Sequence, residues 1–223
     1  MNNSIIQLLV LAGIAVFLIL KLRSVLGTRD GFEKPPTPRE GEGAAAEAAR
    51  PRKFEVIEGS VDYDIQNHVA PDSPTGQALA AMKRAEPSFN VSEFLGGARG
   101  AYEMIVMGFE RGTLEDIRPF LAPEVYETFA EVVAAREAQG LTVEANFIGI
   151  SELALHEATF DARSKEGEVS VRFISELTTV VRNSAGEIVE GSAIAVKRQR
   201  DVWTFSRQMG SADPNWVLVA TGE

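Results

Sequence analysis

The sequence predicts an α+β fold in which helices pack on one antiparallel sheet, behind an N-terminal transmembrane helix and a disordered tether. Between residues 89 and 140 the apolar residues recur every three or four positions, which is the period of an amphipathic helix. Between residues 141 and 221 they alternate with polar residues, which is typical of strands with one buried face. Helices followed by a run of strands favour this class over alternating α/β units.

The apolar run from Ile5 to Leu20 predicts a transmembrane helix, and we assign residues 1–26 to a membrane anchor. A helix from Ile5 to Leu22 would be roughly 27 Å long, close to the roughly 30 Å hydrocarbon core of a bilayer. Basic residues follow the run and none precedes it, so a cleaved signal peptide is not favoured. The segment is therefore expected to stay in the membrane.

The basic residues beside this run predict its orientation. Lys21, Arg23, Arg29 and Lys34 all lie on its C-terminal flank, and such a flank stays in the cytoplasm. The N-terminus is then outside and the bulk of the chain is cytoplasmic. We expect Lys21, Arg23 and Arg29 to contact anionic lipid headgroups, each contributing about 1 kcal/mol.

Length and charge limit the remaining possibilities. The 223 residues leave room for one anchor and one domain of ordinary size, because single domains typically take about 100–150 residues. The formal net charge is -10, and apart from the flank of the anchor the basic residues are scattered. A phosphate-binding surface is therefore not supported, and we expect no nucleic-acid partner.

Residues 27–74 are predicted to form the disordered tether. Up to about residue 53 they are mostly Gly, Pro, Ala and Glu, a composition that cannot bury enough apolar surface to offset the entropy of ordering. Residues 54–65 differ, because apolar side chains there alternate with acids. That segment is a candidate for docking on the domain or on a partner, and its role stays open.

Three helices are predicted next. The first covers Thr75–Ala85. The second starts from Asn90 as the N-cap, with Glu93 at N3 and the Phe89–Phe94 pair as a hydrophobic staple, and it ends at Gly112. Glycines 96, 97 and 100 inside it indicate close packing of another helix, since no strand precedes them as in a phosphate-binding loop.

A capped start at Thr113–Asp116 leads to the third helix, which begins with Pro123 at N1 and ends at Gly140. Its predicted inward face consists of Val125, Phe129, Val132, Val133 and Arg136.

Four strands are predicted after Gly140. One of them, around residues 169–177, alternates apolar and polar side chains most clearly. The others cover 141–160, 192–208 and 215–221, with turn-rich stretches at 164–167, 183–186 and 210–214. The short turns between consecutive strands predict an antiparallel meander.

Five sequence blocks resemble the signature blocks of the Tim44-like domain family, in order and at the usual separations. They are Phe94–Val106, Pro119–Tyr126, Arg136–Gly140, Asp201–Arg207 and Asp213–Thr221. The resemblance implies a cone-like fold akin to nuclear transport factor 2, over residues 75–223, with a hydrophobic pocket for a lipid or a partner. The mitochondrial namesake tethers an import-motor chaperone to the inner-membrane translocase. With its own predicted anchor, this chain is more similar to bacterial relatives of the alphaproteobacterial type, which implies a bacterial inner membrane.

Aromatic residues are the best candidates for a binding site. Core packing is the usual role of such residues, but a part of the group that lined an open cavity would suit an acyl chain or an apolar side chain of a partner. The possible pocket residues are Phe109, Tyr126, Phe129, Phe147, Phe173, Trp203, Phe205 and Trp216.

Three functions are weighed. The leading one is a single-pass inner-membrane adaptor that docks a membrane, chaperone or translocation partner. The alternative is a hydrophobic-ligand or lipid-binding module. The third is an isomerase or dehydratase, because cone-shaped folds also host enzymes with an Asp or His base facing a Tyr.

Few residues support the enzyme. His68 falls in the predicted tether, and a sheet-edge position is favoured for His156. Asp201 could point inward as a lone carboxylate, although the solvent face of its strand or a hydrogen bond to the backbone is the commoner arrangement. The carboxylates show no metal-ligand spacing, and the sequence contains no nucleophile elbow or P-loop. We expect no catalysis, metal or cofactor.

Overall fold

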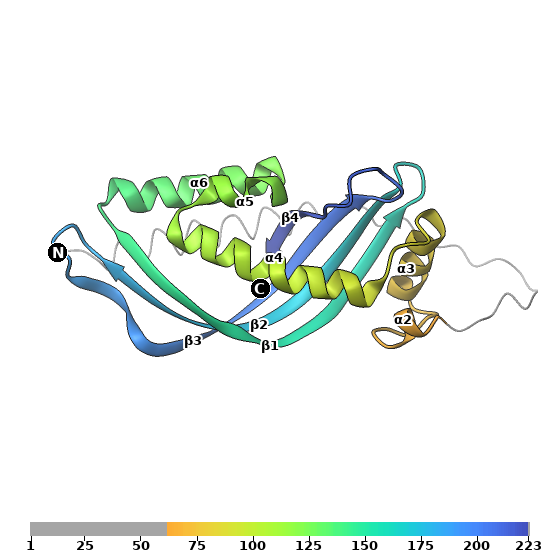
Figure 1. The fold of residues 1–223 in the computed structure, drawn as a ribbon, viewed down its shortest axis with the longest axis horizontal. Helices are drawn as coiled ribbons and strands as arrows, with labels where there is room; N and C mark the ends of the chain where they lie inside the picture. Colours follow the sequence, from red (N-terminus) through yellow and green to blue (C-terminus); the bar gives the residue numbers. More distant parts are fainter. Residues whose placement is uncertain (1–61, 223) are drawn as a thin grey trace, which may run out of the picture. The chain divides into compact units, whose positions relative to one another are not determined.

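The computed structural model describes residues 62–222, which are coloured in Figure 1. The predicted anchor, with Lys21, Arg23 and Arg29, and the predicted tether up to residue 61 lie outside the described residues. Among residues 62–222, no helix is both long enough and apolar enough to cross a membrane.

A four-stranded antiparallel sheet forms one layer of the domain (Figure 1). Consecutive strands are neighbours, in the order β1-β2-β3-β4, which confirms the predicted meander. The α+β class is confirmed with it, because the helices pack on this sheet. The strands are β1 Thr142–Asp161, β2 Glu166–Arg182, β3 Ile188–Gln208 and β4 Val217–Gly222.

Irregular pairing bends the long strands, and their curvature is visible in Figure 1. Between β2 and β3 the register jumps from the Leu177–Lys197 pair to the Thr179–Ser192 pair. Gly191 at this jump has φ +78°, and a Cβ there would lie 2.0 Å from the Thr179 carbonyl oxygen. Only glycine fits such a close approach without distortion.

The helices form the second layer. Helix α4 crosses the face of the sheet in Figure 1; α3 and α4 contact β1, and α6 contacts β4. The elements are α2 Tyr63–Gln66, α3 Pro74–Ala85, α4 Val91–Arg111, α5 Leu114–Ile117, the 3-10 helix η1 Arg118–Phe120 and α6 Pro123–Ala138.

Local sequence signals set the ends of α4. The Asn90 side-chain oxygen accepts a hydrogen bond from the Glu93 backbone N–H at 2.8 Å, and the Phe89 and Phe94 rings lie 6.4 Å apart. Gly112 ends the helix with φ +73°, a conformation that glycine adopts at little cost. The predicted start and stop are both confirmed.

The other helices follow the predictions less closely. Helix α6 begins at Pro123 as predicted, but Val132, expected on its inward face, is 39% exposed. Thr113 precedes α5 without capping it through its side chain. These differences arise because α5 and α6 contribute few residues to the core, so burial constrains them less.

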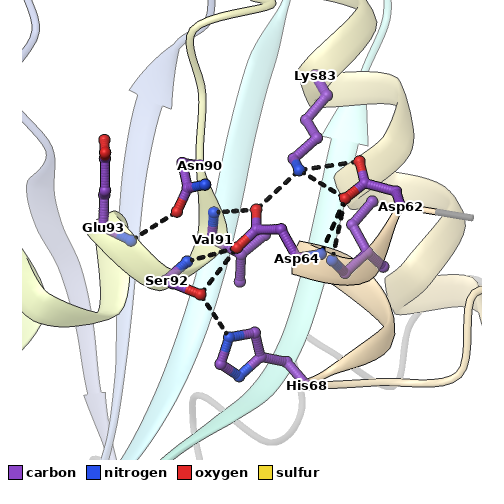
Figure 2. Close-up of polar contacts among 9 residues, drawn as sticks. Asp62, Asp64, His68, Lys83, Asn90, Val91, Ser92 and Glu93 are labelled. Atoms are coloured by element: carbon purple, nitrogen blue, oxygen red, sulfur yellow. Dashed lines mark hydrogen bonds and ion pairs between the residues drawn. The ribbon is translucent and has the colours of Figure 1, made fainter.

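The folded part starts before residue 75. Residues 62–74, assigned above to the tether, form α2 and the loop into α3, and Ile65 is only 2% exposed. Figure 2 shows the Asp64 carboxylate at the start of α4, where it accepts from the Val91 N–H at 2.7 Å and the Ser92 N–H at 3.0 Å. Lys83 Nζ lies 2.7 Å from Asp64 Oδ2. These contacts hold α2 against α3 and α4.

The outer face of α4 is open, which corrects the interpretation of its glycines. A Cβ at Gly96, Gly97 or Gly100 would have no described residue within 4 Å. These glycines therefore do not serve close helix packing within residues 62–222.

Replacing Asp64 tests the contact between α2 and α4. Burial alone would raise the pKa of Asp64, but hydrogen bonds from Lys83, Val91 and Ser92 outweigh it and lower this pKa from 3.8 to about 2. Asp64→Asn should reduce the free energy of unfolding by about 1–3 kcal/mol at pH 7. Urea titration followed by tryptophan fluorescence reports on the domain, because both tryptophans of the chain, Trp203 and Trp216, lie in it.

The same variant carries a pH test. As the pH falls, the unfolded chain takes up the proton first, so this stabilisation is present above about pH 4 and is lost as the pH falls through about 2. The difference between wild type and Asp64→Asn should shrink in that window. Asp72→Asn, in the exposed loop before α3, is the control and should match wild type. If the difference in free energy of unfolding between wild type and Asp64→Asn is the same at every pH, the lowered pKa assigned to Asp64 is contradicted.

Candidate functional site

A small cavity of about 170 Å³ lies between α4, α6 and the strands β3 and β4. Its apolar wall comes from both helices and from Trp203 on β3, and its polar wall comes mainly from three side chains with carboxylate or amide groups. The lining residues are Ile105, Val106, Phe109, Glu110, Phe129, Gln199, Asp201, Trp203 and Thr221.

Three of the eight predicted pocket residues line this cavity. Phe109 on α4 and Phe129 on α6 face each other with ring centroids 4.7 Å apart, and Trp203 lies on β3. The guanidinium carbon of Arg136 lies 4.6 Å from the centroid of the Phe109 ring, within the range of a cation–π contact. The cavity wall is thus formed by aromatic side chains from three different elements.

The other five predicted residues lie elsewhere. Phe173 and Phe205 are fully buried core residues, at 0% and 2% exposure, and Phe147 packs near Tyr102 with centroids 6.2 Å apart. Trp216 packs on Phe94, 4.6 Å between centroids. The Tyr126 hydroxyl donates to Glu115 on the exposed side of α6. These five residues do not line the cavity.

A buried polar contact lies behind the cavity. The ring of Tyr102 on α4 is 0% exposed, and its hydroxyl hydrogen-bonds with Ser175 Oγ at 2.8 Å and donates to Asp201 Oδ2 at 2.5 Å. Burial, together with the adjacent Asp201 carboxylate, raises the pKa of Tyr102. Asp201 also accepts from the Gln199 side-chain amide at 3.2 Å. Asp201 therefore points inward to Tyr102 and the cavity and not to the solvent face of its strand.

Glu110 is the second carboxylate of the cavity. Burial raises the pKa of Glu110, while the positive charges of Arg136 and Lys197 partly offset this effect. The Arg136 guanidinium lies 3.8 Å from Glu110 Oε2. The carboxyl therefore holds its proton to a higher pH than an exposed glutamate.

The histidines do not contribute to the cavity. His68 Nε2 lies 3.1 Å from Ser92 Oγ, far along the chain from the cavity residues, and His156 is exposed on β1, at the edge of the sheet. Within residues 62–222, no group of His, Cys, Asp or Glu side chains could hold a metal ion.

Sequence reasoning missed Glu110 and the pairing of Tyr102 with Asp201. The signal for Glu110 was available, because it lies eight positions after Tyr102, about two helical turns along the same side of α4. The partner of Tyr102 could not be read from the pattern, because 99 positions separate it from Asp201.

The fold and the cavity define a class of protein, an α+β domain with helices on one face of an antiparallel sheet and an aromatic cavity between the layers. The model of the Tim44-like domain matches residues 75–223. The chain therefore belongs to the Tim44-like domain family.

A curated relative and a solved structure extend this comparison. The chain is 24% identical to the human (Homo sapiens) mitochondrial import inner membrane translocase subunit TIM44 over 140 residues, covering 62% of this chain and 30% of the human protein. It thus spans less than a third of that relative. The intermembrane space region of chloroplast protein ARC6 is similar with a TM-score of 0.35 and 12% identity, covering 49% of this chain and 75% of that one.

Removing the Tyr102 hydroxyl tests the buried contact. Tyr102→Phe should lower the free energy of unfolding by about 1–3 kcal/mol, because Asp201 and Ser175 lose a buried partner. Tyr126→Phe is the matched control, since its hydroxyl contacts the exposed Glu115, and it should leave stability unchanged. Equal effects of the two changes in urea titrations would contradict the assigned role of Tyr102.

Proposed function

We propose that this chain is a membrane-anchored adaptor without enzymatic activity, whose Tim44-like domain docks a protein partner in protein translocation at the cytoplasmic face of a bacterial inner membrane. Family membership over residues 75–223 and the translocase subunit among its relatives support the translocation role. The apolar run of residues 5–22 and its basic C-terminal flank support the anchor and its orientation.

The size of the cavity favours a protein partner over a lipid. Sites for small organic ligands typically measure about 300–1,000 Å³, whereas this cavity measures about 170 Å³. An apolar side chain of a partner fits that volume, and a whole acyl chain does not. The preference for a protein partner over a lipid rests on this cavity volume.

The predicted tether would bring the domain to its partner. A flexible linker over residues 27–61 would span roughly 30–35 Å root-mean-square, so the domain would stay close to the bilayer. Such confinement raises the effective concentration of the domain toward membrane-bound partners to around the millimolar range. Weak contacts would then suffice for capture.

Deleting residues 1–22 tests the anchor. The truncated chain should move from the membrane to the soluble fraction and lose partner capture in membrane crosslinking. A chain in which the native residues 5–22 are replaced by an unrelated transmembrane helix is the control, and it should retain both properties. Unchanged capture by the truncated chain would contradict a tethering role.

A photo-crosslinking residue at position 129 tests docking at the cavity. Phe129 lines the cavity, while Val132 on the same helix is 39% exposed. In intact membranes, the probe at 129 should capture a defined protein and the probe at 132 should capture much less. Equal yields would contradict docking at the cavity, and mainly lipid adducts at 129 would favour the lipid-binding alternative.

A catalytic role is the second candidate, because Asp201 lines the cavity and faces the Tyr102 hydroxyl. Against it, that hydroxyl donates its one proton to Asp201 and is not free to stabilise a substrate oxyanion. Isomerases and dehydratases begin by removing a proton next to a carbonyl. The wild-type protein can be tested for catalysis of deuterium exchange into small enones and 3-hydroxyacyl thioesters. Exchange that Asp201→Asn abolishes would favour the enzyme.

A further inference from the structure

A groove lies beside the outer face of α4, between its C-terminal half and α5, and its lining is both apolar and charged, with Glu103, Arg111 and Asp116 among the residues. It measures about 380 Å³, and Met104, Met107 and Ile117 contribute apolar surface to it. Met104 is 38% exposed. Next to these residues, Gly96, Gly97 and Gly100 leave open space, because a Cβ at any of them would have no described residue within 4 Å. Another helix can therefore approach the α4 backbone closely here.

Glycines alone do not say what covers this face, but the charges at its two ends do. Glu93 and Arg111 are 18 positions apart, which is five turns at 3.6 residues per turn, so both lie on one line along the helix. Within residues 62–222, neither side chain makes a hydrogen bond or an ion pair. The line from Glu93 to Arg111 thus has an acidic end, a middle formed by glycines and Met104, and a basic end, and the exposed Glu103 lies beside its middle.

This pattern is complementary to itself when two copies run antiparallel. We place the two-fold axis at the level of position 102. A residue a given number of positions before 102 then faces, in the second copy, the residue the same number of positions after 102. Glu93 then faces Arg111 of the second copy, and this pair occurs twice because the axis repeats every contact. Gly100 faces Met104, which is 38% exposed and fits the gap left by the glycine, whereas Gly97 faces Met107, which is 8% exposed and only forms part of the groove floor.

We propose that the outer face of α4 is a self-association surface, on which the α4 helices of two copies of this chain pack antiparallel. The pairing uses the face opposite to the sheet and leaves the cavity between α4 and α6 accessible. It goes beyond the proposed adaptor function and does not depend on it. A single helix pair buries less than the about 1,200 Å² of a standard interface, so the association is weak and is best detected by covalent trapping.

A single introduced cysteine provides the trap, because the chain has no cysteine of its own. Residue 103 is exposed and lies near the two-fold axis, but about 80° round the helix from the Glu93–Arg111 line, so its two copies would lie about 3 Å apart along the helix direction and roughly 8 Å apart across it. That separation is too wide for a disulfide, so the full-length Glu103→Cys chain, treated in membranes with a short bifunctional maleimide, should form a crosslinked dimer. Glu131→Cys, exposed on α6, is the matched control and should stay mostly monomeric.

Charge reversal then tests the proposed register. In the Glu103→Cys background, Glu93→Arg or Arg111→Glu alone should each reduce dimer yield about tenfold, because attraction becomes repulsion at both ends. The chain carrying both changes should regain the yield, which also excludes misfolding as the cause of the loss. Equal dimer yields at positions 103 and 131, or no recovery in the double variant, would overturn the proposal. So would crosslinking of position 103 only to a different protein.

Discussion

Helix α4 is held on the sheet through the ring and hydroxyl of Tyr102, and the rest of the domain depends on this contact. The ring stacks on Phe173 at 4.3 Å between centroids and lies 4.5 Å from Trp203. Because the hydroxyl is buried, it also requires partners, and Ser175 and Asp201 provide them. Apolar burial alone would tolerate a rotated helix, whereas these hydrogen bonds fix the rotation of α4. That rotation decides which side chains face the cavity and which face outward.

The start of α4 and the end of α3 are fixed by separate contacts. Asn90 and Asp64 accept hydrogen bonds from the first N–H groups of the helix, which would otherwise lack partners. The two carboxylate oxygens of Glu86 accept from Arg207 and from the Gly210 N–H, which ties the end of α3 to the end of β3. With its N-terminal end and its inner face held, α4 is a rigid support for the cavity at its C-terminal half.

The composition of the cavity is consistent with docking rather than chemistry. Its aromatic residues offer apolar contact area with a defined shape, and its two carboxylates already have partners, Arg136 near Glu110 and Tyr102 on Asp201. A rigid, mostly apolar cavity with satisfied polar groups can hold a side chain of a partner without reorganising. The proposed adaptor would need no more than this, because confinement by the proposed anchor would supply the remaining affinity.

The sequence by itself determined the features that depend on neighbouring residues. The cap at Asn90, the stop at Gly112, the start at Pro123, the alternation along β2 and the order of the strands all follow from patterns a few positions long. Its prediction of an anchor over residues 1–26 stays a prediction.

Only the tertiary structure decided the contacts between distant segments. It placed Asp64 on the start of α4, turned Asp201 inward to Tyr102, selected three of eight aromatic residues for the cavity and, among residues 62–222, left the α4 glycines uncovered. The partners of Tyr102 lie 73 and 99 positions along the chain. No local periodicity carries that information, because such contacts are set by how the layers pack and not by the propensity of either segment.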